Sequence, residues 1–477
     1  MMFFRIKRGE IIKRRVFGDA PVYLLTAALQ SISPLILLPM QRVSLGLDSL
    51  GMVILASTVS GFTGLLATMG VADSVLRRRL AGDVHVSEAM RIVRTIPFAA
   101  IPTSILVAVC LGFSGLNTSM SSQWAIIVGA LSGISICTLL VCQQSVRADG
   151  RPWSYLLNIV VWQFISPLVG LGLVLFGFGI KGYLLGWGGA LVLGACWAVQ
   201  SSIFPHRPLP KAENSLFNSY RDSIALGFPI LLHSLAGAAV LLVDRSVLAS
   251  SHGGKDVAIY QAIFLLGQAT GMVLSAFNNS WAVRIFKSKV EERWRGQRIE
   301  IGVLAFAVLG LVGGLMIVVQ VVFRFMMGSQ VDPRWPTIII VCMASLGMTQ
   351  ILYLGGMNAL YLTGKTRDLA KITLPCALAQ SLLSVVLIQP LGYLGPCIAI
   401  IVVQSLQSIL VWCHARRGSQ VEPISGYWWF SAILLWLVLI FTAGLNSSLY
   451  PVSGALLVVF SLLGVGRIVR RRDRALI

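Results

Sequence analysis

The chain alternates between long apolar runs and short polar connections. Each run holds about 20 mostly apolar residues, the length that an α-helix needs to cross a bilayer. The runs are continuous rather than alternating, and backbone groups in hydrocarbon must be hydrogen-bonded within their own segment, so the spans are helices. The expected spans are Pro21–Met40, Leu50–Gly70, Ile96–Phe113, Trp124–Gln143, Trp153–Phe176, Leu184–Ile203, Ile224–Val243, Ile259–Val283, Ile301–Phe323, Ile338–Leu362, Ile372–Ile388, Leu394–Trp412, Tyr427–Leu445 and Leu449–Val465. This pattern predicts an all-α, polytopic integral membrane protein with about 14 transmembrane helices.

The composition agrees with lipid as the main solvent. Of the 477 residues, 56% are hydrophobic and only 12% are charged. Average soluble chains carry roughly 25% charged residues. The same figures exclude an intrinsically disordered chain, a fibrous repeat and a disulfide scaffold.

The formal charge of +20, from 38 Lys and Arg against 18 Asp and Glu, is distributed unevenly. When the cations are sorted into the connections, the side of the amino-terminal arm receives all except six: Arg42, Lys181, Arg245, Lys255, Arg324 and Arg334. The positive-inside rule then places both termini in the cytoplasm and the chain in the inner (cytoplasmic) membrane. Basic residues spread over many short connections favour anionic membrane lipids as partners and argue against nucleic acid.

Signals for catalysis or metal binding are missing from the sequence. The eight cysteines lie in apolar runs without a C-x-x-C motif or a Cys/His cluster, so no metal and no cofactor is expected. No phosphate-binding loop, G-x-S-x-G or H-E-x-x-H motif occurs. The connections are too short for a soluble domain. The sequence therefore predicts a protein that is not an enzyme and whose function lies within the helices.

Polar residues within spans are costly and often mark a pathway. They form faces in the first, second, seventh and eighth spans. For a single Ser or Thr, hydrogen-bonded packing of helices is the alternative explanation. The residues that stand out are Gln30, Gln261, Gln268, Asn278 and Asn279, together with His233 and Asp244 on one face of the seventh span.

An internal repeat relates these four spans. The features of the first two recur in the seventh and eighth after about 205 positions, as in transporters built from parallel repeats. The expected organisation is a basic cytoplasmic arm (1–20), an N-lobe of six spans (21–221), a C-lobe of six spans (222–418), and a terminal helix pair with a basic tail (419–477).

The residues of these repeated spans resemble those of a known family. The pattern Pro34 … Pro39 … Arg42 … Gly46 … Leu50-Gly51 … Gly70 … Arg77, and Asp244-Arg245 followed by Ile259-Tyr260, is similar to the polysaccharide transporter family. These are the Wzx-type flippases of the multidrug/oligosaccharidyl-lipid/polysaccharide exporter superfamily. The likeness is clearest over 34–79 and 222–287.

The resemblance implies that a lipid-linked oligosaccharide, on an undecaprenyl diphosphate type of carrier, is turned from the inner to the outer leaflet by alternating access. The five Gln and Asn residues above can hydrogen-bond a glycan, and Phe264 or Trp281 can stack on a sugar face. Cations can hold the diphosphate at the two mouths. The candidates are Arg284 with the Arg77–Arg79 run inside, and Arg42 and Arg245 outside. Alternatively, Arg42 and Arg245 only snorkel to head groups.

We assign coupling to Asp244 and His233. We expect Asp244 to pair with Arg42 in one state. His233 would act as a proton relay or, alternatively, as a packing residue. A multidrug exporter of the same superfamily, a membrane-embedded glycan polymerase or ligase, and a scaffold are the competing functions. The glycan polymerase machinery is a further candidate partner.

Overall fold

The computed structural model describes residues 22, 25–26, 28–30, 32–81, 86–113, 120–203, 215–287, 290–363, 365–418, 426–444 and 450–474. Every regular element in these ranges is a helix. This confirms the all-α class. Each expected span from the second onward overlaps a helix, while the first is described at 22, 25–26, 28–30 and 32–40 and is helical there.

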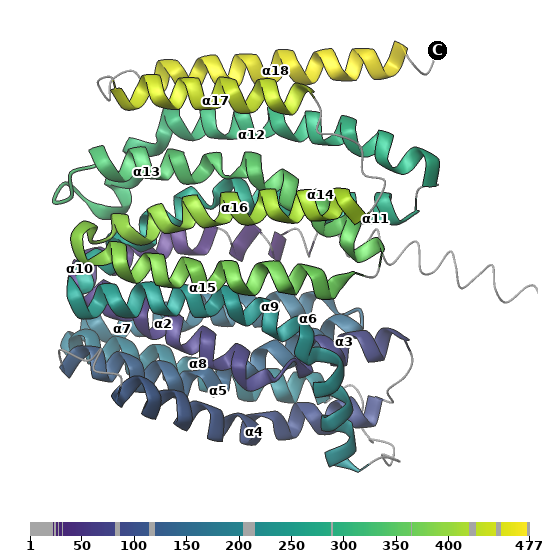
Figure 1. The fold of residues 1–477 in the computed structure, drawn as a ribbon. Coiled ribbons are helices and arrows are strands. Elements are labelled where there is room, and N and C mark those ends of the chain that lie inside the picture. Colours follow the sequence, from purple (N-terminus) through teal and green to yellow (C-terminus); the bar gives the residue numbers. More distant parts are fainter. Residues whose placement is uncertain are drawn as a thin grey trace, which may run out of the picture. The chain divides into compact units, whose positions relative to one another are not determined.

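The chain divides into two compact units, Met1–Lys255 and Asp256–Ile477. The first contains helical residues 32–45 and then α2 (Leu47–Thr68), α3 (Val71–Ala81), α4 (Val86–Phe113), α5 (Met120–Ala148), α6 (Pro152–Val160), the π-helix η1 (Val161–Ile165), α7 (Ser166–Leu173), the π-helix η2 (Val174–Phe178), α8 (Gly179–Ile203) and α9 (Leu216–Ser251) (Figure 1).

The second unit takes up the rest of the chain, and α10 begins just before its first residue. Its helices are α10 (Gly254–Gly267), α11 (Ala269–Lys287), α12 (Val290–Met327), α13 (Arg334–Ser345), α14 (Gly347–Leu362), α15 (Thr366–Leu391), α16 (Leu394–Gly418), α17 (Gly426–Gly444) and α18 (Tyr450–Arg474).

In the first unit, α2 and α5 form the core, and α4 and α8 pack on α5 from outside. The most apolar windows of α2 and α5 are 72% and 78% buried, whereas that of α4 is only 28% buried. In the segment Pro152–Ile203, which holds the fifth and sixth spans, the most apolar window is 22% buried. The outer helices therefore present apolar side chains to the surroundings, as lipid-facing helices must.

The basic ends of these helices lie together at one end of the unit. Arg78 donates to Ser223 Oγ (3.0 Å) on α9, and Arg79 forms an ion pair with Asp149 after α5. Arg151 donates to the Ser201 backbone oxygen (2.9 Å) near the end of α8. These contacts join the connections that the charge sorting assigned to one side of the membrane.

In the second unit, α12 packs against α13, α14 and the terminal pair α17 and α18. Ser461 on α18 donates to the Phe306 backbone oxygen (2.6 Å) on α12, and the Trp428 indole on α17 donates to the Met348 backbone oxygen (2.9 Å) on α14. The terminal pair is thus an integral part of this unit.

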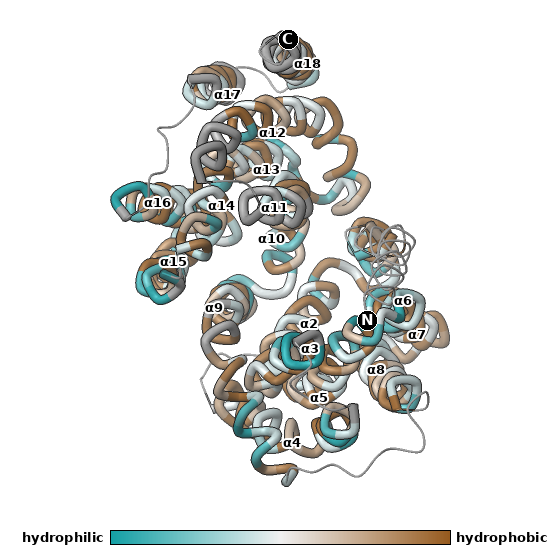
Figure 2. The backbone as a smooth tube through the Cα atoms, turned by 90° about the vertical axis from the view of Figure 1, so that its right-hand side faces the viewer, coloured by the Kyte–Doolittle hydropathy of each residue, from teal (hydrophilic) through white to brown (hydrophobic). Residues whose placement is uncertain are grey.

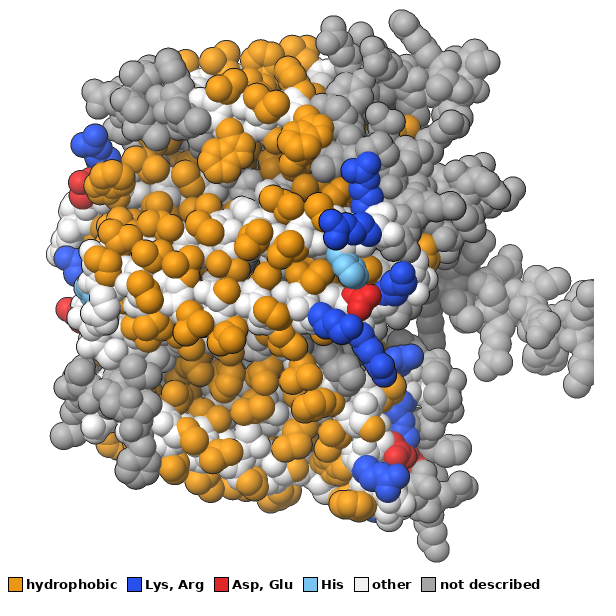
Figure 3. All heavy atoms as spheres, viewed as in Figure 1, with side chains coloured by type: hydrophobic (Ala, Val, Ile, Leu, Met, Phe, Trp, Pro, Cys, Tyr) orange, Lys and Arg blue, Asp and Glu red, His pale blue; other side chains and the backbone are white. Residues whose placement is uncertain are grey.

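Length and apolarity support a multi-pass membrane protein. Within the described ranges, nine helical segments can cross a membrane, or ten if the bent pair α10–α11 is one span; α17 and α18 contribute shorter apolar stretches. The helices are mostly hydrophobic, with α3 a clear hydrophilic exception (Figure 2). On the face shown in Figure 3, hydrophobic side chains cover the middle of the helices, and charged ones lie near their ends.

The boundary between the units differs from the expected division between lobes at 221/222, because α9 packs on α2, α3 and α4 of the first unit. Packing units and sequence repeats need not divide at the same residue, so the repeat-based lobes stay a prediction.

Candidate translocation site

Two adjacent buried charges of the first unit lie on α9. Asp244 is 0% exposed and Arg245 is 7% exposed. The Arg245 guanidinium donates a hydrogen bond to Thr58 Oγ1, in the middle of α2. Arg245 therefore turns inward to another helix, and the alternative that it snorkels to head groups is wrong. Burying an ionised side chain among apolar helices is costly, which makes Arg245 a candidate for a functional role.

Arg42 lies in the last turn of the first helix. Its side chain is half-buried, and its buried Nε has no hydrogen-bond partner among the residues that the structure describes. Its neighbour Gln41 is held in place, since Gln41 Nε2 donates to the Tyr183 hydroxyl (2.6 Å) on α8. A buried N–H donor without a partner costs free energy, and an anion reaching this position would supply the acceptor.

Glycines bring α2 and α9 close together at both ends, through Gly254 at the start of α10, which follows α9, and through Gly70 just after α2. A Cβ atom on Gly51 would overlap the Gly254 backbone, and one on Gly227 would overlap the backbone of Gly70, which itself has a φ of 80°. Beside the first pair, the Asp48 carboxylate accepts a hydrogen bond from the Lys255 backbone N–H (3.0 Å). We call these contacts the α2–α9 seam, with an Asp48 end and a Gly70 end. Only glycine permits so close an approach of two backbones.

The Arg77–Arg79 run is largely occupied by protein contacts. Besides binding Ser223, Arg78 lies 4.0 Å from the carboxylate of Asp222. Arg79 pairs with Asp149, and the two side chains are only 9% and 7% exposed. Of the three arginines, Arg77 alone is exposed. Arg77 is therefore the member of this run that is accessible to an anionic ligand.

Amide side chains gather along α11 and α14 in the second unit. Helices α10 and α11 meet at Gln268 with a 44° bend. A Cβ atom on Gly271 would lie 2.9 Å from Gln350 Oε1 and 3.1 Å from Gln268 Oε1, so both amides converge there. Farther along the same helices, Asn358 Nδ2 donates to Asn278 Oδ1 (2.8 Å). Broken helices that expose polar groups between spans are typical of transporter binding sites.

Sequence reasoning missed Gln350 and Asn358. They are eight residues apart, which places them on the same face of α14. This spacing was the available signal, and it was overlooked because the tenth span is otherwise strongly apolar.

The remaining expected residues divide into three groups. Gln30 and Gln261 are half-buried. The expectation that Trp281 stacks on a sugar is wrong: its ring is 0% exposed and packs near Phe277 (ring centroids 6.3 Å apart), whereas Phe264 is half-buried beside Tyr260. Three expected side chains lie outside the described residues: His233, Asn279 and Arg284.

The fold can be compared with known proteins. No protein-family model matches the chain, and no curated protein matches it in sequence. Among solved structures, it is similar to the lipid II flippase MurJ in an inward closed conformation, with 13% identity and a TM-score of 0.65, over 96% of this chain and 99% of that one. It is also similar to a multidrug resistance MATE family transporter of the MOP superfamily in an inward-facing conformation, with 17% identity and a TM-score of 0.60, over 84% and 98% of the two chains. A MATE structure in complex with MaD3S aligns with 15% identity and a TM-score of 0.52, over 82% and 95%. The chain therefore has the polytopic transporter fold shared by MOP-superfamily MATE proteins and the MurJ flippase.

Proposed function

We propose that the chain is a Wzx-type flippase that moves a lipid-linked oligosaccharide, on an undecaprenyl diphosphate type of carrier, from the inner to the outer leaflet. The proposal rests above all on Arg245, a buried guanidinium held within the apolar first unit by Thr58. Arginine suits this task because its planar fork binds phosphate oxygens with two parallel hydrogen bonds.

Arg42 is the second cation in this scheme. Its buried Nε, without a partner among the described residues, is a donor that a phosphate oxygen of the carrier would satisfy. Arg284 would meet the diphosphate at the opposite mouth. In this arrangement the carrier keeps a cation at each end of its path while the glycan crosses between them.

The glycan would hydrogen-bond to amides. In the second unit these include Gln261, Gln268 and Asn278, with Asn279 on the same helix and Gln350 facing Gln268. Gln30 of the first helix is the corresponding amide of the first unit. Sugar hydroxyls both donate and accept, and an amide offers both functions in one side chain.

Alternating access would open and close the α2–α9 seam at one end at a time, as the repeat-based lobes 21–221 and 222–418 rock against each other. Coupling is assigned to Asp244, which would pair with Arg42 in one state and release it in another, with His233 as its proton relay. The membrane is the inner (cytoplasmic) one, with both termini in the cytoplasm, and the glycan polymerase machinery is a candidate partner.

The test is a flipping assay in proteoliposomes with a fluorescent lipid-linked oligosaccharide, comparing the whole chain with Arg245→Gln and Arg42→Gln. The matched control is Arg221→Gln, which removes an exposed arginine from the same helix as Arg245. Removing a charge-assisted hydrogen bond costs about 1.5–3 kcal/mol, so each site variant should flip roughly 10- to 100-fold more slowly. Equal rates in all four proteins would refute the proposal.

A multidrug exporter is the second candidate, favoured by the similarity to MATE transporters. The two functions separate in a deletion strain. A flippase defect causes a lipid-linked glycan to accumulate on the cytoplasmic leaflet, whereas an exporter defect changes dye resistance and leaves glycan intermediates at their normal level. A glycan polymerase or ligase defect would instead leave the glycan intermediate on the outer leaflet.

A further inference from the structure

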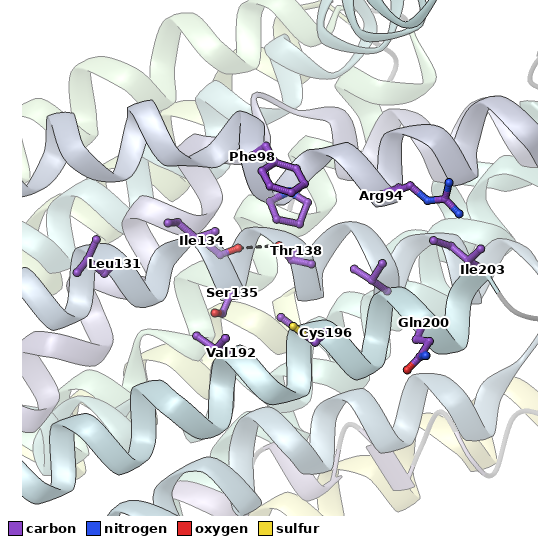
Figure 4. Close-up of a pocket in the computed structure, with 13 residues that line it drawn as sticks. Arg94, Phe98, Leu131, Ile134, Ser135, Thr138, Val192, Cys196, Gln200 and Ile203 are labelled. Carbon is purple, nitrogen blue, oxygen red and sulfur yellow. Dashed lines mark hydrogen bonds between the residues drawn. The ribbon is translucent and has the colours of Figure 1, made fainter.

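The first unit contains a pocket that lies apart from the α2–α9 seam. It lies between α4, α5 and α8 and has a volume of about 700 Å³. This is within the range of roughly 300–1,000 Å³ that holds small ligands. Figure 4 shows its lining residues on the three helices, with Leu131 and Val192 toward one end and Arg94, Gln200 and Ile203 toward the other.

The walls of this pocket suit a hydrocarbon chain. Phe98, Leu131 and Val192 are 72%, 49% and 51% exposed, so large apolar surfaces border the cavity. The Thr138 hydroxyl donates to the Ile134 backbone oxygen (2.8 Å), so this lining hydroxyl is already hydrogen-bonded within its own helix. Water gains little from such a surface, whereas a chain of methylenes buries apolar area at no polar cost.

The end near Gln200 carries a charge. Arg94 is the one charged side chain among the described lining residues, and it is exposed. It lies in the third turn of α4, while Gln200 lies in the last turn of α8. These turns belong to the end of the unit where Arg79 meets Asp149, which is the predicted cytoplasmic side. A head group bound here would therefore belong to the inner leaflet.

We propose that this pocket binds one anionic phospholipid of the inner leaflet, with an acyl chain between α4 and α8 and the phosphate on the Arg94 guanidinium. Charge complementarity selects the occupant: an arginine at a pocket mouth matches a phosphate at head-group depth, and apolar walls match the chain below it. Gln200 adds an amide for the glycerol or head-group oxygens. Neither Arg94 nor Gln200 belongs to the proposed flipping path, so this site goes beyond the proposed function.

Cys196 provides a built-in reporter, because its thiol is exposed and lines the pocket. The whole chain in detergent micelles is treated with a small maleimide, and modification is followed by mass spectrometry of peptides. Cys413, an exposed thiol on α16, serves as the reference within the same molecule. Phosphatidylglycerol at ten times its Kd should slow modification of Cys196 about tenfold and leave Cys413 unchanged. Phosphatidylcholine should protect Cys196 far less.

Two variants separate the charge from the apolar walls. Arg94→Gln should raise the Kd for phosphatidylglycerol about fivefold, as expected for one basic residue at a membrane surface, and so weaken the protection of Cys196. Arg221→Gln, which removes an exposed arginine outside the pocket, should preserve it. Ala195→Phe, which fills the pocket from α8, should slow modification even without lipid.

Three results would overturn the proposal. Equal protection by the two phospholipids would show that the charge is not recognised. Absence of protection by any lipid would show that the pocket stays empty. Protection by undecaprenyl phosphate but not by phosphatidylglycerol would assign the pocket to the carrier chain of the proposed substrate. Loss of flipping in the Arg245→Gln protein bears on none of these outcomes, so the two proposals fail independently.

Discussion

Replacement of Gly51 by Ala should loosen the Asp48 end of the α2–α9 seam. The added Cβ would overlap the carbonyl group of Gly254, and this obstacle is backbone rather than a flexible side chain. The two helices must therefore separate, which also lengthens the hydrogen bond from the Lys255 N–H to Asp48. Overpacking of this kind costs about 1–3 kcal/mol.

The matched control is Gly61→Ala in the same helix. A Cβ at Gly61 meets no atom within 4 Å, so the change adds helix propensity without a clash. Both substitutions gain about 1 kcal/mol of propensity, and the difference between them isolates the cost of separating the backbones. The Gly51→Ala protein should be less stable than the Gly61→Ala protein by roughly 1–3 kcal/mol.

The assay is thermal unfolding in detergent, together with the rate at which a cysteine at position 52, close to the seam, reacts with a water-soluble maleimide in vesicles. Met52 is 7% exposed and directly follows Gly51, so a cysteine at this position becomes accessible when the helices separate beside Gly51. An opening free energy lowered by 1.4 kcal/mol corresponds to about tenfold faster reaction. If Gly51→Ala and Gly61→Ala gave the same unfolding midpoint and the same reaction rate, the seam would not be the close contact described above.

Three further experiments test the packing of the two units. Loss of one partner of the buried Arg79–Asp149 pair should cost about 3–5 kcal/mol, whereas Arg79→Met with Asp149→Leu should cost much less; a double-mutant cycle of unfolding free energies measures the difference. Asn358→Leu should cost about 1 kcal/mol by removing its bond to Asn278, seen as a lower unfolding midpoint in detergent. Trp428→Phe should cost about 1 kcal/mol and increase proteolysis of the terminal pair.

The span pattern could be predicted because it depends on averages along the chain. About 20 apolar residues specify a membrane helix whatever they contact. The position of Trp281 could not be predicted in this way. A tryptophan on a partly polar face is compatible with a binding surface, and only the packing of α11 against its neighbours shows that this ring is fully buried.

The polar contacts of the second unit could not be predicted from the sequence either. Gln268 and Asn278 stand out in the sequence because amides are rare within spans, but the amides that approach them, Gln350 and Asn358, come from a helix about 80 residues away. No proline lies near the bend at Gln268, so the sequence does not predict this bend. Which side chains meet between two helices depends on the shape and register of those helices. A hydropathy pattern carries no information about either.

The same glycines that form the α2–α9 seam also account for the position of the buried arginine. Arg245 donates from α9 to Thr58 on α2, and this contact requires that the two backbones run close together. Gly51 with Gly254 and Gly70 with Gly227 set that distance on either side of Thr58. A larger residue at either pair would therefore move the guanidinium away from its acceptor. The same packing therefore sets both the spacing of the helices and the position of the charge. Separation of the seam would detach the Arg245 guanidinium from Thr58 within the apolar interior, where its attraction to an anionic head group would be strongest.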